Sequence, residues 1–145
     1  MHIPSAAFRY GYCTGGGPLL PSAFAAHVNE YFHPHQPVND TEVKITSAAT
    51  SLHDVLAFSL CQPGEGILIS RPYYGRFVVD FGNQAGVKVV TVDMDHENCF
   101  DETSVLEMYE EAFQHSEQEG VKIKAVMVVN PHNPLGMYVA VLRNL

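Results

Sequence analysis

The chain has 145 residues, 46% of them hydrophobic, and a formal net charge of −8. This size and composition allow one globular domain with a core and exclude a disordered chain. The negative charge argues against a nucleic acid or an anionic membrane as the main partner. No apolar run is long enough to span a membrane, the first residues lack the order of a signal peptide, and the three cysteines form no C-x-x-C pair. We therefore expect a soluble, cytoplasmic protein.

The first predicted elements are a helix, a strand and a second helix. The first helix runs from about 20 to 32, with Pro21 in its first turn, where a missing N–H costs nothing. The segment "EVKITS" (Glu42–Ser47) alternates and is rich in β-branched residues, so it predicts a strand. The second helix follows at once, with Ser51 as its expected N-cap, and the turn "PGEG" (63–66) ends it.

Two further strands and a helix are predicted in the middle of the chain. Ile67–Ser70 is a short apolar run bounded by turns, a pattern typical of a buried strand. Tyr74–Asn83 is predicted to be helical, and Gly86 punctuates its end. Val87–Val92 follows as the third strand.

A capping-box pattern begins the last helix. Ser104 and Glu107 form this pattern at the head of a helix that reaches Glu119, and Ile123–Val129 is predicted as the fourth strand. Strands that alternate with helices predict an α/β fold, with a mainly parallel sheet and helices on both faces. In such sheets ligands bind at the carboxyl ends of the strands, so those turns are the places to search for a site.

Three turns at predicted strand ends are candidate sites. "TSAATS" (Thr46–Ser51) joins a strand to a helix start with small and hydroxyl side chains, which suits a phosphate, although by itself an ordinary capped turn explains it better. "RPYYGRF" (Arg71–Phe77) offers aromatic surface for a planar ligand or for core packing. In "NPHNPLG" (Asn130–Gly136) two prolines stiffen a turn and fix the direction of the Asn133 side chain.

Other conspicuous features predict no site. Gly15-Gly16-Gly17 matches neither the dinucleotide fingerprint nor a phosphate loop that ends in Gly-Lys-Ser/Thr. His33 and His35 flank a proline without a third ligand nearby, so no metal site is predicted. The chemistry of this chain therefore depends on the three turns.

Taken together and in this order, the three turns resemble a known family. "TSAATS", "RPYYGRF" and "NPHNPLG", with the strands between them, are similar to the front half of the large domain of class I/II aminotransferases, which are fold-type I pyridoxal-phosphate enzymes. The sequences "RPYYGRF" and "NPHNPLG" are most similar to the branch of the family that includes 1-aminocyclopropane-1-carboxylate synthase and fungal members linked to secondary metabolism. The resemblance covers about residues 10–136 of a single domain of 145 residues and leaves 137–145 as an unmatched tail. Ala48 departs from it, since the family usually has a glycine there, which raises the steric cost if that residue needs positive φ.

The resemblance implies a cofactor, pyridoxal 5'-phosphate, and the residues that bind it. Ala49 and Thr50 match the turn that holds the cofactor phosphate through backbone N–H groups and a hydroxyl. Tyr74 matches the aromatic that stacks on the pyridine ring, and Asn133 matches the asparagine that hydrogen-bonds the phenolic oxygen of the ring. The family is homodimeric, and Tyr10 or Tyr12 is similar to a tyrosine that reaches the cofactor phosphate of the partner subunit.

The resemblance also implies groups that this chain lacks. The family uses a lysine that forms a Schiff base and moves a proton, together with an aspartate at the pyridinium nitrogen. None of the lysines present lies in the matching context, so we assign no catalytic residue and expect the chain by itself to be inactive. In the family, later segments supply the strands between those matching "EVKITS" and "VMVV" (Val126–Val129). We therefore expect the first strand to lack its neighbour and the fourth to present an open, apolar edge.

Three interpretations remain open for the chain. The first is a fragment of an aminotransferase-like or 1-aminocyclopropane-1-carboxylate synthase-like enzyme that acts on amino acids in biosynthesis. The second is a non-catalytic protein of the same family that binds the cofactor or docks on another protein. The third is a truncated or decayed reading frame. The substrate and the reaction type are not predicted, because one cofactor supports several reactions.

Overall fold

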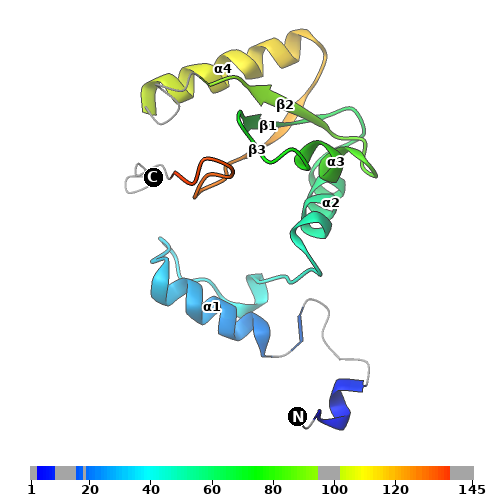
Figure 1. Cartoon of the computed structure of the whole chain (residues 1–145), viewed down its shortest axis with the longest axis vertical. Coiled ribbons are helices and arrows are strands. Elements are labelled where there is room, and N and C mark those ends of the chain that lie inside the picture. The colour runs from blue at the N-terminus through cyan, green and yellow to red at the C-terminus, as the bar shows by residue number, and fades with distance from the viewer. Residues whose placement is uncertain (1–2, 9–15, 18, 95–101, 138–145) are drawn as a thin grey trace. The chain divides into compact units, whose positions relative to one another are not determined.

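The computed structural model describes residues 3–8, 16–17, 19–94 and 102–137. The chain divides into two compact units, Met1–Ala49 and Thr50–Leu145. The helices and strands follow in the order η1 (Ser5–Phe8), α1 (Leu20–Tyr31), η2 (Asp40–Glu42), α2 (Ala49–Leu60), β1 (Gly66–Ser70), α3 (Phe77–Gly82), β2 (Lys88–Val92), α4 (Glu102–Gln118) and β3 (Ile123–Met127), where η marks 3₁₀ turns (Figure 1). None of the described helices is long and apolar enough to cross a membrane.

The first unit is built on α1 and the turn η2. The Asn29 side chain exchanges two hydrogen bonds with the backbone of Val38, at 2.9 and 2.8 Å, and so fixes the chain that returns from α1. The Ser22 hydroxyl donates to Asp40 of η2 at 2.9 Å. Among the described residues, side-chain hydrogen bonds thus connect α1 to the segment that follows it and pair the backbone groups of Val38.

The strand predicted for Glu42–Ser47 does not form, and this prediction was wrong. Glu42 ends η2, Val43 has an extended backbone, residues 43–46 belong to no helix or strand, and 47–48 form a bend. A strand needs a neighbour to pair its backbone groups, and among the described residues the sheet contains β1, β2 and β3 alone. The alternating pattern of this segment was therefore insufficient to make it a strand.

The second unit contains a parallel sheet in the order β2–β1–β3. The alternating side chains of β1 point to opposite faces, so Ile67 and Ile69 lie on one face and Leu68 on the other. Helices α2 and α3 pack on the first face, and α4 packs on the opposite face along all three strands (Figure 1). This arrangement confirms the predicted α/β class, with an incomplete parallel sheet between two layers of helices.

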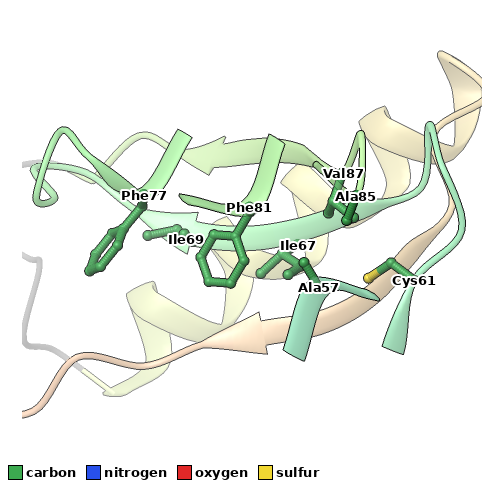
Figure 2. Packing of buried hydrophobic residues seen from close by; sticks show 8 residues of the cluster. All are labelled: Ala57, Cys61, Ile67, Ile69, Phe77, Phe81, Ala85 and Val87. Atoms are coloured by element: carbon green, nitrogen blue, oxygen red, sulfur yellow. The ribbon is translucent and has the colours of Figure 1, made fainter. Parts of the chain in front are cut away.

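The core of the second unit lies between the sheet, α2 and α3. Figure 2 shows the side chains of Phe77 and Phe81 from α3 lying over Ile67 and Ile69 of β1, with Ala57 of α2 and Cys61, the residue after this helix, closing the cluster. All of these residues are buried, and burying each large side chain contributes about 1.5–3 kcal/mol relative to exposing it. The core thus fixes α2 and α3 on one face of β1.

Strand β3 forms an edge of the described sheet, as expected. Within the described residues it pairs with β1 alone, and Val126 and Val128 are 52% and 68% exposed. Ala125 and Met127 of β3, and Val129 just beyond it, pack against the core. The strand therefore carries apolar side chains on both faces but buries only one of them.

Several predicted boundaries shift by a few residues. Helix α2 begins at Ala49, before the predicted N-cap Ser51, because alanine is a strong helix former and a serine can sit inside a first turn. Helix α3 begins at Phe77 and not at Tyr74, because Gly75 disfavours helix. Gly66, predicted in a turn, is the first residue of β1 and is buried there. Among the described non-glycine residues, positive φ occurs at His33 and not at Ala48, so the alanine in the first turn is not strained.

Candidate functional site

The start of α2 places Thr50 at the surface of the second unit. Ala49 and Thr50 are the first two residues of this helix, and both are exposed. The first N–H groups of a helix have no intrahelical acceptor, and with the helix dipole they favour an anion. The Thr50 hydroxyl donates to Oδ2 of Asp80, on α3, at 3.2 Å. Thr50, one of the predicted phosphate-binding residues, is thus hydrogen-bonded to α3.

The two neighbouring tyrosines in the loop after β1 lie in different environments. Tyr73 lies with its ring nearly parallel to that of Phe77, at 6.4 Å and 25°, and packs against the core. Tyr74 meets Phe77 edge-on, at 5.6 Å and 78°, and is 47% exposed. The exposed ring belongs to Tyr74, so Tyr74 rather than Tyr73 can stack on a planar ligand.

A closed turn after β3 carries Asn133. The backbone N–H of His132 donates to the Met137 carbonyl at 2.6 Å, and that of Gly136 donates to the His132 carbonyl at 2.7 Å. Gly136 has a φ of +66°, which glycine adopts without steric cost. Asn133 is exposed on this turn, and its side chain is available for a ligand.

An Asp–His pair, which the sequence did not single out, lies beneath the start of α2. Asp80 is buried on α3, and its Oδ2 accepts from Nδ1 of His53, on α2, at 3.1 Å. The His53 ring lies between Phe77 and Phe81, with centroid distances of 5.2 and 5.1 Å. Arg76 lies 3.8 Å from Oδ1 of Asp80. The available signal was an aspartate inside the apolar run "FVVDF", since a carboxylate in such a run needs partners when it is buried.

Of the four predicted cofactor residues, the structure connects Thr50 and Tyr74 through a chain of contacts that does not include Asn133. Thr50 and Tyr74 are joined through Asp80, His53 and Phe77, each in contact with the next. Within the described ranges, Asn133 makes no hydrogen bond to Thr50 or Tyr74. The Tyr74 and Asn133 loops follow β1 and β3, which are parallel neighbours, so both leave the same edge of the sheet. The tyrosines expected to reach a partner subunit, Tyr10 and Tyr12, lie outside the described residues.

The cysteine of the core is not a nucleophile of this site. Burial raises the pKa of the Cys61 thiol, the Glu65 carboxylate raises it further, and Lys124 opposes both effects. A raised pKa leaves little thiolate near neutral pH, and the thiolate is the reactive form. Cys61 is therefore a packing residue.

The part of the chain that contains all three turns matches one protein family. The family model described as aminotransferase class I and II matches residues 7–141. The probable aminotransferase sirI of Leptosphaeria maculans is 32% identical over 135 residues, which cover 93% of this chain and 32% of that protein. The 1-aminocyclopropane-1-carboxylate synthase of Malus domestica is 39% identical over 92 residues, which cover 63% of this chain and 19% of that protein.

Solved structures show the same fold. An archaeal alanine:glyoxylate aminotransferase superposes with a TM-score of 0.76 at 24% identity and covers 96% of this chain and 32% of its own. A mutant aspartate aminotransferase of Thermus thermophilus superposes with a TM-score of 0.67 at 23% identity, over 89% of this chain and 31% of its own. The chain spans about a third of the length of the fungal relative and of both solved structures.

Proposed function

Because the chain belongs to the aminotransferase class I and II family, we propose that it supplies one wall of a cofactor site in an enzyme that acts on amino acids. Enzymes of this family depend on pyridoxal 5'-phosphate. When bound, this cofactor supplies an electron sink for reactions at the carbon next to the amino group. By themselves, we propose, these 145 residues bind the cofactor without catalysing turnover.

The described residues fit such a cofactor. The first turn of α2, with Ala49 and Thr50, would hold the phosphate through N–H groups that lack an intrahelical acceptor. The exposed Tyr74 ring would cover one face of the pyridine ring and exclude water from it. Asn133 would donate a hydrogen bond to the phenolic oxygen of the ring. The contacts that join Thr50 to Tyr74 through Asp80, His53 and Phe77 are the observation that carries this proposal.

The positions of the lysines support the absence of turnover. Lys88 is the first residue of β2, Lys122 precedes β3, and Lys124 is its second residue. These residues lie at the amino ends of the strands, whereas Tyr74 and Asn133 follow the carboxyl ends. Lys44 donates to the Thr41 carbonyl at 3.1 Å. We therefore assign none of them as the lysine that binds the cofactor covalently.

Binding can be measured without interference from lysine chemistry. Pyridoxamine 5'-phosphate carries an amine and cannot form a Schiff base with a protein, so calorimetry or fluorescence reports its non-covalent binding. We expect saturable binding that is tighter than that of pyridoxamine, which lacks the phosphate. Tyr74→Ala should weaken binding about tenfold through the lost ring contact, whereas Tyr31→Ala, at an exposed tyrosine of the first unit, should not. Equal affinity for both ligands, unaffected by Tyr74→Ala, would show that the proposed site is wrong.

The lack of turnover is tested with the aldehyde form of the cofactor. Pyridoxal 5'-phosphate is added, the mixture is reduced with borohydride, and the modified lysines are mapped by mass spectrometry. We expect scattered, substoichiometric labelling and no amino-group transfer from amino acids. Stoichiometric labelling of one lysine, together with transfer, would restore a catalytic role to this chain.

The role of an intact enzyme is a separate proposal. Because its relatives include 1-aminocyclopropane-1-carboxylate synthases, we propose a cytoplasmic, homodimeric enzyme of amino-acid biosynthesis. Sequencing the transcript beyond the codon for Gly136 tests it directly. A reading frame that continues with a lysine in the family context supports the enzyme. A frame without one favours a non-catalytic protein that binds the cofactor or another protein.

A further inference from the structure

The buried carboxylate of Asp80 is shared between two helices. Its side chain is 2% exposed, and its Oδ2 accepts from the Thr50 hydroxyl at 3.2 Å and from the His53 ring at 3.1 Å, both on α2. Its Oδ1 is buried without a hydrogen bond and lies 3.8 Å from the Arg76 guanidinium. A buried carboxylate costs several kcal/mol unless it is paired. If Asp80 only filled space in the core, an apolar residue would do so without this desolvation cost.

The partners of Asp80 are the elements that carry the proposed cofactor residues. Thr50 belongs to the turn proposed for the phosphate, and Tyr74 precedes α3. Phe77 packs edge-on against both the His53 ring, at 85°, and the Tyr74 ring, at 78°. Asp80 thus contacts the phosphate turn directly, through its hydrogen bond with Thr50. It is connected to the Tyr74 ring indirectly, through His53 and Phe77.

The charges around Asp80 match a neighbouring anion site. A bare carboxylate behind Thr50 would repel a phosphate, but the Arg76 guanidinium lies 3.8 Å from Oδ1 of Asp80 and offsets its charge, while the His53 ring hydrogen-bonds Oδ2. A hydroxyl has one proton, so while Thr50 donates to Asp80 it cannot donate to a phosphate. The backbone N–H groups of Ala49 and Thr50 would then be its donors, and their direction depends on how firmly the first turn is held.

We infer that Asp80, paired with His53, is a positioning residue for the phosphate turn: it anchors Thr50 and sets the start of α2 relative to α3 and Tyr74. This inference deepens the proposed function and rests on it for the identity of the ligand. The anchoring itself is a property of the free chain, so it can be tested without any ligand.

The first experiment measures the side-chain rotamer of Thr50 by three-bond NMR couplings to its methyl carbon. In the unsubstituted chain we expect one dominant rotamer, because the hydroxyl is fixed on Asp80. Asp80→Ala should give averaged couplings at Thr50, whereas those of Thr46, whose hydroxyl donates to the Ala48 carbonyl, should not change. If Asp80→Ala fails to fold, Asp80→Asn keeps the side-chain volume and should give partial averaging. Unchanged Thr50 couplings in the folded variant would overturn the inference.

The second experiment connects the anchor to the ligand. The ratio of the dissociation constants of pyridoxamine and pyridoxamine 5'-phosphate isolates the phosphate contribution to binding. Asp80→Ala should lower this ratio by about tenfold, because a turn that is no longer held in place loses about one backbone hydrogen bond to the charged phosphate. In a Thr50→Val background the same substitution should add little, because both changes act on one contact.

The outcomes separate the two proposals. Equal weakening of both ligands by Asp80→Ala, or additive effects with Thr50→Val, would overturn the positioning role and leave the cofactor site standing. A ratio near one in the unsubstituted chain would overturn the proposed phosphate site, while the rotamer of Thr50 would still decide whether Asp80 anchors the turn.

Discussion

Replacing Gly66 with alanine should destabilise the second unit, although alanine normally stabilises a strand relative to glycine. Gly66 is buried at the start of β1, between β2 and β3. A Cβ at this position would lie 2.8 Å from Cδ1 of Ile123, 3.0 Å from Cγ1 of Val121 and 3.1 Å from Cγ2 of Val90. Ordinary van der Waals contacts begin near 3.4 Å, so three neighbours must move at once.

The size of the effect follows from two opposing terms. Loss of glycine flexibility favours alanine by about 0.5–1 kcal/mol. Overpacking of a filled core costs about 1–3 kcal/mol. The net expectation is a loss of about 0–2.5 kcal/mol, with a middle value near 1 kcal/mol. For a unit of this size, each kcal/mol lowers the melting temperature by about 4–8 °C.

Thermal and urea unfolding, followed by circular dichroism, measure this loss. Gly75→Ala is the matched control, because a Cβ there would meet nothing within 4 Å and its φ is not positive. The control should be neutral or slightly stabilising. If Gly66→Ala were as stable as Gly75→Ala, the packing of Val121, Val90 and Ile123 around Gly66 would be wrong.

Three further substitutions test the core, the thiol and the sheet edge. Phe81→Ala should cost about 3–5 kcal/mol in urea unfolding, whereas Phe58→Ala, at a side chain that is 81% exposed, should change stability by less than about 0.5 kcal/mol; similar losses would contradict the assigned core. Because the pKa of Cys61 is raised in the folded chain above its ordinary value of 9.0, its neutral form favours folding at lower pH, and this contribution is lost as pH rises through the folded pKa. Urea midpoints above about pH 9 should therefore fall more steeply for the unsubstituted chain than for Cys61→Ala, and parallel pH profiles would refute the assignment. Val126→Lys, at the open edge of β3, should reduce concentration-dependent association in analytical ultracentrifugation, and unchanged association would show that this edge is not the contact surface.

Local patterns were enough to predict most of the second unit. Ile67–Ser70, Val87–Val92 and Ile123–Val129 are apolar runs bounded by turns, and each matches a strand of the sheet to within two residues at either end. Their alternation with helices predicted parallel pairing, because a crossover helix returns the chain to the same edge. The pattern failed at Glu42–Ser47, because a strand exists only when a neighbour pairs its backbone.

The sequence by itself determined the types of residue available for the site: a hydroxyl turn at Thr50, an aromatic pair at Tyr73 and Tyr74, and a stiff turn at Asn133. The tertiary structure decided which tyrosine is exposed, because the packing of Phe77 takes Tyr73 toward the core and leaves Tyr74 outside. It also brought Asp80 to Thr50 across a separation of 30 residues. Sequence patterns report on residues that are close together in the chain. The partners of a buried carboxylate such as Asp80 come from another helix, so they are set only when both helices pack on one face of the sheet.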